Sequence, residues 1–139
     1  MPESFVFENT VAMGPAARTY FAAKLSVETD AWDVYHDLKN GVTGFVLVDP
    51  RSPESYAKGH IPGAVNSSHH ALDRSIAEKL PEARLYIVYC SGPGCNAAAK
   101  AAVKLASYGI AVREMIGGLE WWQKSGYPVH AGADPGSFS

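Results

Sequence analysis

Short apolar runs alternate with helix-forming segments along most of this chain, and this alternation constrains the fold more than any other feature. Residues 45–48, 85–89 and 111–115 have the composition of buried strands. Each run is followed by a polar or glycine-rich turn and then by a segment of helical character. Strands that alternate with helices in this way indicate a three-layer α/β domain, with a mostly parallel central sheet and helices on both faces.

Capping residues and stop signals predict the remaining elements. Further strands are expected over residues 24–26 and 64–66. One helix is expected to begin at a cap on Thr29 or Asp30 and to end at Asn40. The other helices are expected over residues 16–23, 52–59, 71–80, 96–108 and 119–124. We therefore predict a single domain over residues 1–139, with a core at about 24–129, an N-terminal extension over 1–23 and a C-terminal tail over 130–139.

The composition excludes several classes of partner. Twelve Lys and Arg against fourteen Asp and Glu give a net charge of −2 without a dense basic stripe, so nucleic acid is not an expected partner. No apolar stretch is long enough to span a bilayer, and the first residues lack the pattern of a signal peptide. A cytoplasmic location is therefore expected, where the two cysteines are read as thiols.

Neither a cofactor nor a metal is expected, because Cys90, Cys95 and the adjacent His69 and His70 lack the spacing of a structural zinc site.

Cys90 stands at the end of a predicted strand, immediately before a glycine-rich loop and a helix. Loop amides and the positive end of the helix dipole would favour its thiolate form. Gly92 and Gly94 allow the positive φ angles of an anion cradle, and Pro93 contributes no donor. The amides expected to form the cradle are those of Ser91, Gly92, Gly94, Cys95 and Asn96. From these residues alone Cys90 is either a nucleophile or a small buried residue at a strand end.

Three segments resemble the signatures of the rhodanese-like domain family. The first signature is matched by VLVDPRSPESY at 46–56 and GHIPGAVN at 59–66. Tyr89 and Cys90 occupy the place of the catalytic cysteine loop, and residues 116–122 with 126–128 resemble the closing signature. The resemblance implies a rhodanese-like α/β domain with sulfurtransferase activity. Its catalytic cysteine would accept a sulfane sulfur, become a persulfide and pass the sulfur to a nucleophilic acceptor.

The loop CSGPGCN departs from the family pattern at one functional point. Many active members carry an arginine near the loop end, where this chain has Cys95 and Asn96. The loop is also about two residues longer than in typical small members, judged from the following helix pattern. Since a guanidinium would help to hold thiosulfate, activity on thiosulfate is in doubt.

The resemblance therefore implies a sulfur donor that is thiosulfate, a polysulfide or a protein persulfide, and an acceptor that is a thiol or a cyanide-like nucleophile. Two other classes stay open. One is a non-catalytic rhodanese-like binding or sulfur-sensing module that recognises a partner through the Cys90 loop or the Trp122 surface. The other, favoured less, is a cysteine-dependent phosphatase or arsenate reductase of related fold. A homodimer is also left open, with the N-terminal segment as a lid or dimer arm.

Other residues near the site have a structural and a functional interpretation. Cys95 is expected to turn into the core, although it would be able to resolve a persulfide by forming a disulfide with Cys90. Asp49 and Arg51 are expected to support the site mainly as a structural ion pair. His60 is expected to hold a turn, and of the adjacent Trp121 and Trp122 one should be buried and the other partly exposed. Asn96 is the expected N-cap of the following helix.

Overall fold

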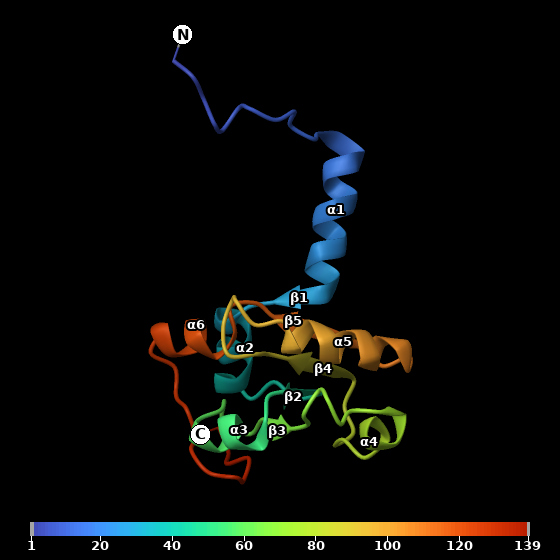
Figure 1. The fold of residues 1–139 in the computed structure, drawn as a ribbon, viewed down its shortest axis with the longest axis vertical. Helices are drawn as coiled ribbons and strands as arrows, with labels where there is room; N and C mark the ends of the chain where they lie inside the picture. Colours follow the sequence, from blue (N-terminus) through green and yellow to red (C-terminus); the bar gives the residue numbers. More distant parts are fainter. Residues whose placement is uncertain (1, 139) are drawn as a thin grey trace.

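The computed structural model describes residues 2–138, and its centre is a parallel sheet of five strands (Figure 1). The strand order is β1-β5-β4-β2-β3. The strands are β1 Glu28–Thr29, β2 Phe45–Asp49, β3 Val65–Asn66, β4 Leu85–Val88 and β5 Val112–Met115. All four pairings are parallel, so the carboxyl ends of the strands meet at one edge of the sheet.

One face of the sheet is covered by α2 (Ala31–Lys39) and α6 (Gly118–Lys124). Val34 of α2 and Trp122 of α6 share a buried cluster with Leu47 and Ile87 of the central strands. Asp30 caps α2 by accepting a hydrogen bond from the amide of Asp33, as its position before the apolar pattern predicts.

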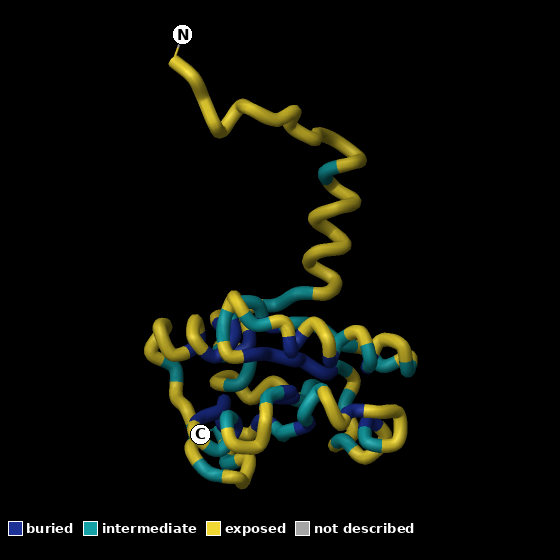
Figure 2. The backbone as a smooth tube through the Cα atoms, in the orientation of Figure 1, coloured by how far each residue is buried: buried dark blue, intermediate teal, exposed yellow. Residues whose placement is uncertain are grey.

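The opposite face is covered by α5 (Ala97–Ser107) and α4 (Arg74–Glu78). Ala101 and Leu105 of α5 pack against Val48 and Val88, which follow Leu47 and Ile87 in their strands and therefore point to the other side. The buried backbone in Figure 2 runs through these central strands. The predicted three-layer architecture is therefore confirmed.

The N-terminal helix differs from its prediction. α1 spans Gly14–Val27, is longer than the expected 16–23, has no buried residue and extends away from the sheet (Figures 1 and 2). The edge strand predicted over 24–26 is wrong, because these residues continue the helix. The edge strand is β1, where Glu28 and Thr29 pair with Glu114 and Met115. A dimer arm remains a prediction for this segment.

The other predicted helices are present, with shifted ends. α3 spans Pro53–Lys58 and is capped by Ser52, as expected. α4 is shorter than the expected 71–80, because Asp73 accepts a bond from Ile76 and so begins the helix at Arg74. None of the described helices has the length and apolar character that crossing a membrane requires.

The predicted tail folds back on the domain. The Gly63 amide donates a hydrogen bond of 2.8 Å to the Pro135 carbonyl, and Phe138 packs against the cluster that contains Trp122. His60 and His130 form an isolated antiparallel bridge. The tail therefore contributes to packing around the turn at residues 60–63.

Candidate functional site

Cys90 lies just beyond the carboxyl end of β4 and is buried, with 3% of its surface exposed. Two bonds from the start of α6 fix its backbone: the Leu119 amide donates to the Cys90 carbonyl and the Glu120 amide to the Ser91 carbonyl, both at 2.8 Å. The closing segment of the sequence thus holds the cysteine loop in place.

Two consecutive glycines make this close contact possible. Gly117 and Gly118 have φ angles of 82° and 62°, in the left-handed region that side chains disfavour. A Cβ on Gly118 would overlap the Cys90 carbonyl oxygen, and one on Gly117 would overlap the Trp121 ring. The Gly117-Gly118 turn predicted from the sequence is therefore a requirement of the packing between α6 and the cysteine loop.

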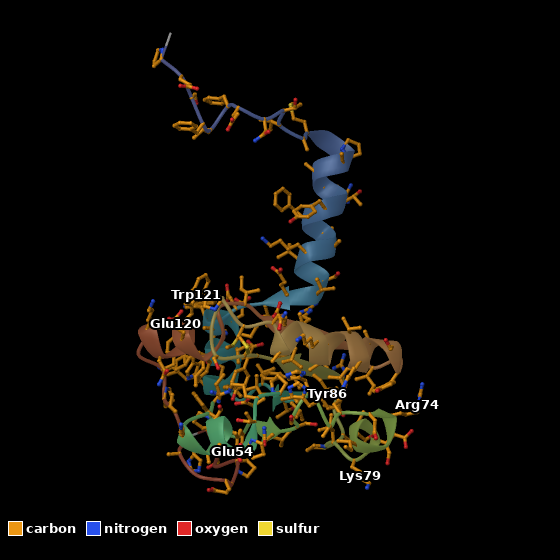
Figure 3. All side chains as sticks on the ribbon, viewed as in Figure 1. Glu54, Arg74, Lys79, Tyr86, Glu120 and Trp121 are labelled. Carbon is orange, nitrogen blue, oxygen red and sulfur yellow. A yellow bond between two sulfur atoms is a disulfide. The ribbon has the colours of Figure 1, made fainter. Side chains whose placement is uncertain are left out.

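The extra residues of the loop form a tight turn. The Cys95 amide donates to the Gly92 carbonyl at 3.1 Å, with Pro93 in the second position that such turns favour. This turn brings Cys95 back to Cys90, and a disulfide joins the two residues across a Cα separation of 6.1 Å (Figure 3). The expectation that Cys95 stays away from Cys90 is wrong, although its half-buried side chain also contacts the core.

The predicted anion cradle needs correction at several residues. Gly92 and Gly94 do not have positive φ angles, and the Cys95 amide is engaged in the turn. Asn96 takes the N-cap position of α5, but its side chain accepts no capping bond. Glycine at position 92 favours the packing for another reason, because a Cβ there would make a tight contact of 3.3 Å with Cβ of Glu120. Among the described residues, the amides of Ser91, Gly92, Gly94 and Asn96 have no hydrogen-bond partner, and of these residues only Gly92 lines the pocket beside the cysteines.

A pocket of about 220 Å³ opens beside the two cysteines. Its other walls include Glu114 and Met115 from the end of β5 and Trp121 from α6, which is labelled in Figure 3. Burial raises the pKa of Glu114, and the nearby Glu28 carboxylate raises it further. Of the residues that the structure describes, Glu114 is the one charged residue that lines this pocket, so no described cation replaces the arginine missing from the loop.

Glu114 lines the pocket but was not among the site residues predicted from the sequence. A signal was present, since Glu114 stands near the end of a predicted strand and parallel strands bring such ends together. Its proximity to Cys90 depends on β5 pairing directly with β4, which the sequence did not specify.

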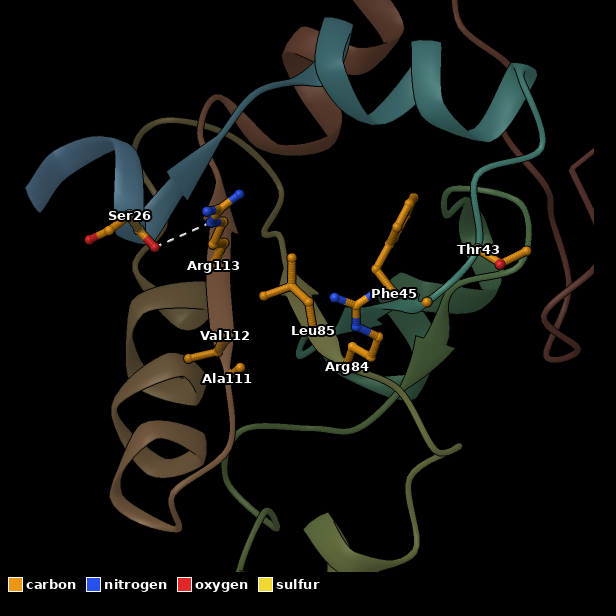
Figure 4. Close-up of a pocket in the computed structure, with 9 residues that line it drawn as sticks. Ser26, Thr43, Phe45, Arg84, Leu85, Ala111, Val112 and Arg113 are labelled. Carbon is orange, nitrogen blue, oxygen red and sulfur yellow. Dashed lines mark hydrogen bonds between the residues drawn. The ribbon is translucent and has the colours of Figure 1, made fainter. Parts of the chain in front are cut away.

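A larger cavity of about 520 Å³ lies at the amino ends of the strands, away from the cysteines (Figure 4). Phe45, Leu85 and Val112, the first residues of three strands, contribute to its walls. It contains Arg84 and Arg113, and Arg113 Nε donates to the Ser26 carbonyl at 3.2 Å. These guanidinium groups lie at the opposite end of the sheet from Cys90.

Asp49 and Arg51 form the structural ion pair that the sequence favoured. Asp49 is fully buried, and Arg51 Nη2 lies 2.6 Å from its Oδ2 and donates to the Gly59 carbonyl at 2.7 Å. Neither residue lines the pocket beside Cys90. The pair therefore connects the end of β2 to the turn after α3.

His60 and the two tryptophans have defined packing roles. The His60 ring is buried, with Nδ1 2.8 Å from the Tyr56 carbonyl and Nε2 3.0 Å from that of Pro135, which agrees with an architectural role. Trp122 is fully buried and Trp121 is 45% exposed. The surface assigned to Trp122 is therefore wrong, and Trp121 is the exposed residue beside the cysteines. No cluster of three metal-ligating side chains occurs within residues 2–138.

Comparisons with known proteins agree with this geometry. The rhodanese-like domain family matches residues 31–125. The HTH-type transcriptional regulator Rv0324 of Mycobacterium tuberculosis is 38% identical to this chain over 90 residues. These residues are 65% of this chain and 39% of the regulator, so the match spans less than half of that protein. The thiosulfate sulfurtransferase GlpE of Pseudomonas fluorescens is 36% identical over 87 residues, 62% of this chain and 76% of the enzyme.

A solved structure shows that the likeness extends to the fold. The BH2092 protein of Bacillus halodurans superposes with a TM-score of 0.80 at 38% identity, covering 89% of this chain and 92% of that one. The matched family region contains β2 to β5, the Cys90 loop and α6. This chain therefore belongs to the rhodanese-like domain family.

Proposed function

We propose that this protein is a rhodanese-type sulfurtransferase that moves a sulfane sulfur through a persulfide on Cys90. The observation that carries the proposal is the position of Cys90, at the carboxyl end of β4, beside a pocket and a loop with unpaired amides. Membership of a family with sulfurtransferase relatives supports the same reaction class.

The reaction has two displacement steps. The Cys90 thiolate attacks the terminal sulfur of a donor, the sulfur–sulfur bond of the donor breaks, and the remainder of the donor leaves with the electron pair. An acceptor nucleophile then attacks the terminal sulfur of the Cys90 persulfide and releases the Cys90 thiolate. Amides of Ser91, Gly92 and Gly94 are available to stabilise the persulfide anion. Both steps require the Cys90–Cys95 bond to be reduced first.

Charge at the pocket favours some donors over others. Glu114 contributes negative charge once ionised, and no cation lines the pocket. Thiosulfate carries two negative charges spread over its five atoms, whereas the persulfide group of a small thiol or a protein carries at most one. We therefore expect the persulfide of a small thiol or a protein to be a better donor than thiosulfate, with a thiol or a cyanide-like nucleophile as acceptor. A cytoplasmic location completes the proposal, because that compartment maintains reduced thiols.

The test is a transfer assay with reduced protein, a polysulfide donor and cyanide as acceptor, in which thiocyanate is measured. Cys90→Ser is expected to abolish enzyme-dependent transfer, and Cys95→Ser is expected to retain it. Transfer that survives Cys90→Ser would contradict the proposal. Absence of transfer and of any sulfur adduct in the wild type would favour the binding or sensing module, while Cys90-dependent hydrolysis of an aryl phosphate would favour the phosphatase class.

A further inference from the structure

We propose that Cys95 is an internal acceptor that releases the sulfur carried by Cys90 as hydrosulfide, so that the protein also reduces sulfane sulfur to sulfide. This inference rests on the proposed function, because it begins from the Cys90 persulfide. It adds a second product and a dithiol cycle to the transfer reaction.

The first support is the bond between the two cysteines. A disulfide shows that Sγ of Cys95 reaches Sγ of Cys90 itself, the inner sulfur of a Cys90 persulfide. The Cα separation of 6.1 Å lies within the ordinary range for disulfides, and the turn closed by Cys95 N–H and the Gly92 carbonyl sets this approach. The additional loop residues thus bring a second thiol to the nucleophile.

The second support is the position of Cys95 at the start of α5. It directly precedes the N-cap residue Asn96, whose side chain leaves the first-turn amides uncapped. The positive end of an 11-residue helix favours a thiolate at this position. Cys95 is therefore suited to attack a neighbouring sulfur.

The pocket provides space for the departing sulfur. Cys90 and Cys95 line one side of it, and Met115, Trp121 and Glu114 line another. With the inner sulfur facing Cys95, the outer sulfur of the persulfide has about 220 Å³ of space in which to leave. Within residues 2–138, Glu114 is the one lining side chain, apart from the cysteines, that can donate a proton to the departing sulfur.

The atoms and electrons balance without an oxidant. Once Glu114 has protonated the outer sulfur of the persulfide, the Cys95 thiolate attacks Sγ of Cys90, the Cys90 Sγ–sulfane bond breaks, and the sulfane sulfur leaves with the bonding pair and this proton as hydrosulfide. The sulfane sulfur is reduced and the two cysteine sulfurs are oxidised to the disulfide. An external dithiol reductant must then regenerate the site.

The exposure of the two cysteines indicates where that reductant enters. Cys90 is 3% exposed, whereas Cys95 is only half-buried. Attack on the more accessible Cys95 sulfur releases the Cys90 thiolate directly, ready for the next donor. The resting structure is therefore the oxidised end of one turnover.

The test is a single turnover with the full-length reduced protein, freed of reductant and mixed with one equivalent of glutathione persulfide, whose own transfer releases a thiol and no sulfide. After rapid quenching by an alkylating reagent, the wild type is expected to release one equivalent of sulfide and to lose both free thiols. Cys95→Ser is expected to release sulfide at least tenfold more slowly and to retain a persulfide on Cys90.

The outcomes separate this inference from the function on which it rests. A wild type that retains its persulfide, with Cys95 still open to alkylation, would overturn the inference and leave sulfur transfer intact. Failure of both the wild type and Cys95→Ser to take up sulfur would refute the proposed function and the inference together. Ser75→Ala serves as the control, because Ser75 is exposed on α4 and does not line the cysteine pocket, and it should release sulfide as the wild type does.

Discussion

Glu28 and Glu114 lie opposite each other on the neighbouring parallel strands β1 and β5. This register places a second carboxylate beside the one that lines the cysteine pocket. Burial and the Glu28 charge both raise the pKa of Glu114 above its ordinary 4.5. The edge strand that follows α1 thus affects the electrostatics of the site.

Glu114→Gln is expected to stabilise the protein at neutral pH. Because the pKa is raised on folding, the native state binds the Glu114 proton more tightly than the unfolded state, and stability is lost as pH rises through the folded pKa. The increase in unfolding free energy of the variant over the wild type should therefore disappear as pH falls below about 4.5, the ordinary pKa of a glutamate. Urea unfolding at several pH values measures this difference, with the exposed Glu8→Gln as control. An increase in stability that does not change with pH would show that the charge of ionised Glu114 is not its cause.

Reduction of the Cys90–Cys95 bond is expected to leave the fold intact and to cost little stability. The disulfide closes a loop with a sequence separation of 5, for which chain entropy predicts about 2 kcal/mol. The cluster under α2 and α6 contains neither cysteine, and in the cluster under α5 the two cysteines are joined by many other packed apolar residues. Denaturant unfolding with and without a dithiol should show a small shift in the midpoint and an unchanged slope. Loss of cooperative unfolding on reduction would show that the bond is essential to the fold.

Arg51→Met is expected to destabilise the protein by about 3–5 kcal/mol, because it leaves the buried Asp49 carboxylate without its partner. The double variant Asp49→Asn/Arg51→Met should recover part of this loss. The exposed Arg84→Met is the matched control and should change stability by less than about 0.5 kcal/mol. Chemical denaturation of each variant and of the wild type measures these three changes in unfolding free energy. Equal losses in the single and double variants would contradict a direct pairing.

Gly118→Ala is expected to disrupt the cysteine loop. The left-handed φ of 62° costs an alanine about 1–2 kcal/mol, and its Cβ would also push the Cys90 carbonyl away from the Leu119 amide. Both unfolding free energy and sulfur transfer per folded molecule should fall. Ser75→Ala, which changes an exposed residue of α4 away from the cysteine pocket, should retain both. Normal transfer by folded Gly118→Ala would show that this contact does not position Cys90.

The sequence predicts those parts of the fold whose cause is local. Asp30 and Ser52 begin their helices as expected, and the alternation of runs predicts the sheet and its helical faces. The strand predicted over 24–26 fails because the location of β1 depends on pairing with distant β5. Local propensity cannot specify such a contact.

The site shows the same limit. The position of Cys90 at a strand end follows from the sequence pattern, but the contact of Cys95 with it depends on how the Gly92–Cys95 turn packs against α6. Gly92 is favoured by its close contact with Glu120 and not by a positive φ. Which tryptophan faces the pocket likewise depends on the rotation of α6, which places Trp122 in the core and Trp121 beside the cysteines.

The most direct test of the central claim is the intact mass of reduced Cys95→Ser after incubation with polysulfide and removal of excess donor. The proposal predicts a gain of one sulfur atom, removed by cyanide and absent when Cys90 is also changed to serine. Using the Cys95→Ser background prevents the internal disulfide from releasing the sulfur before it is measured. An unchanged mass with every sulfane donor, or a sulfur adduct that persists without Cys90, would contradict the account.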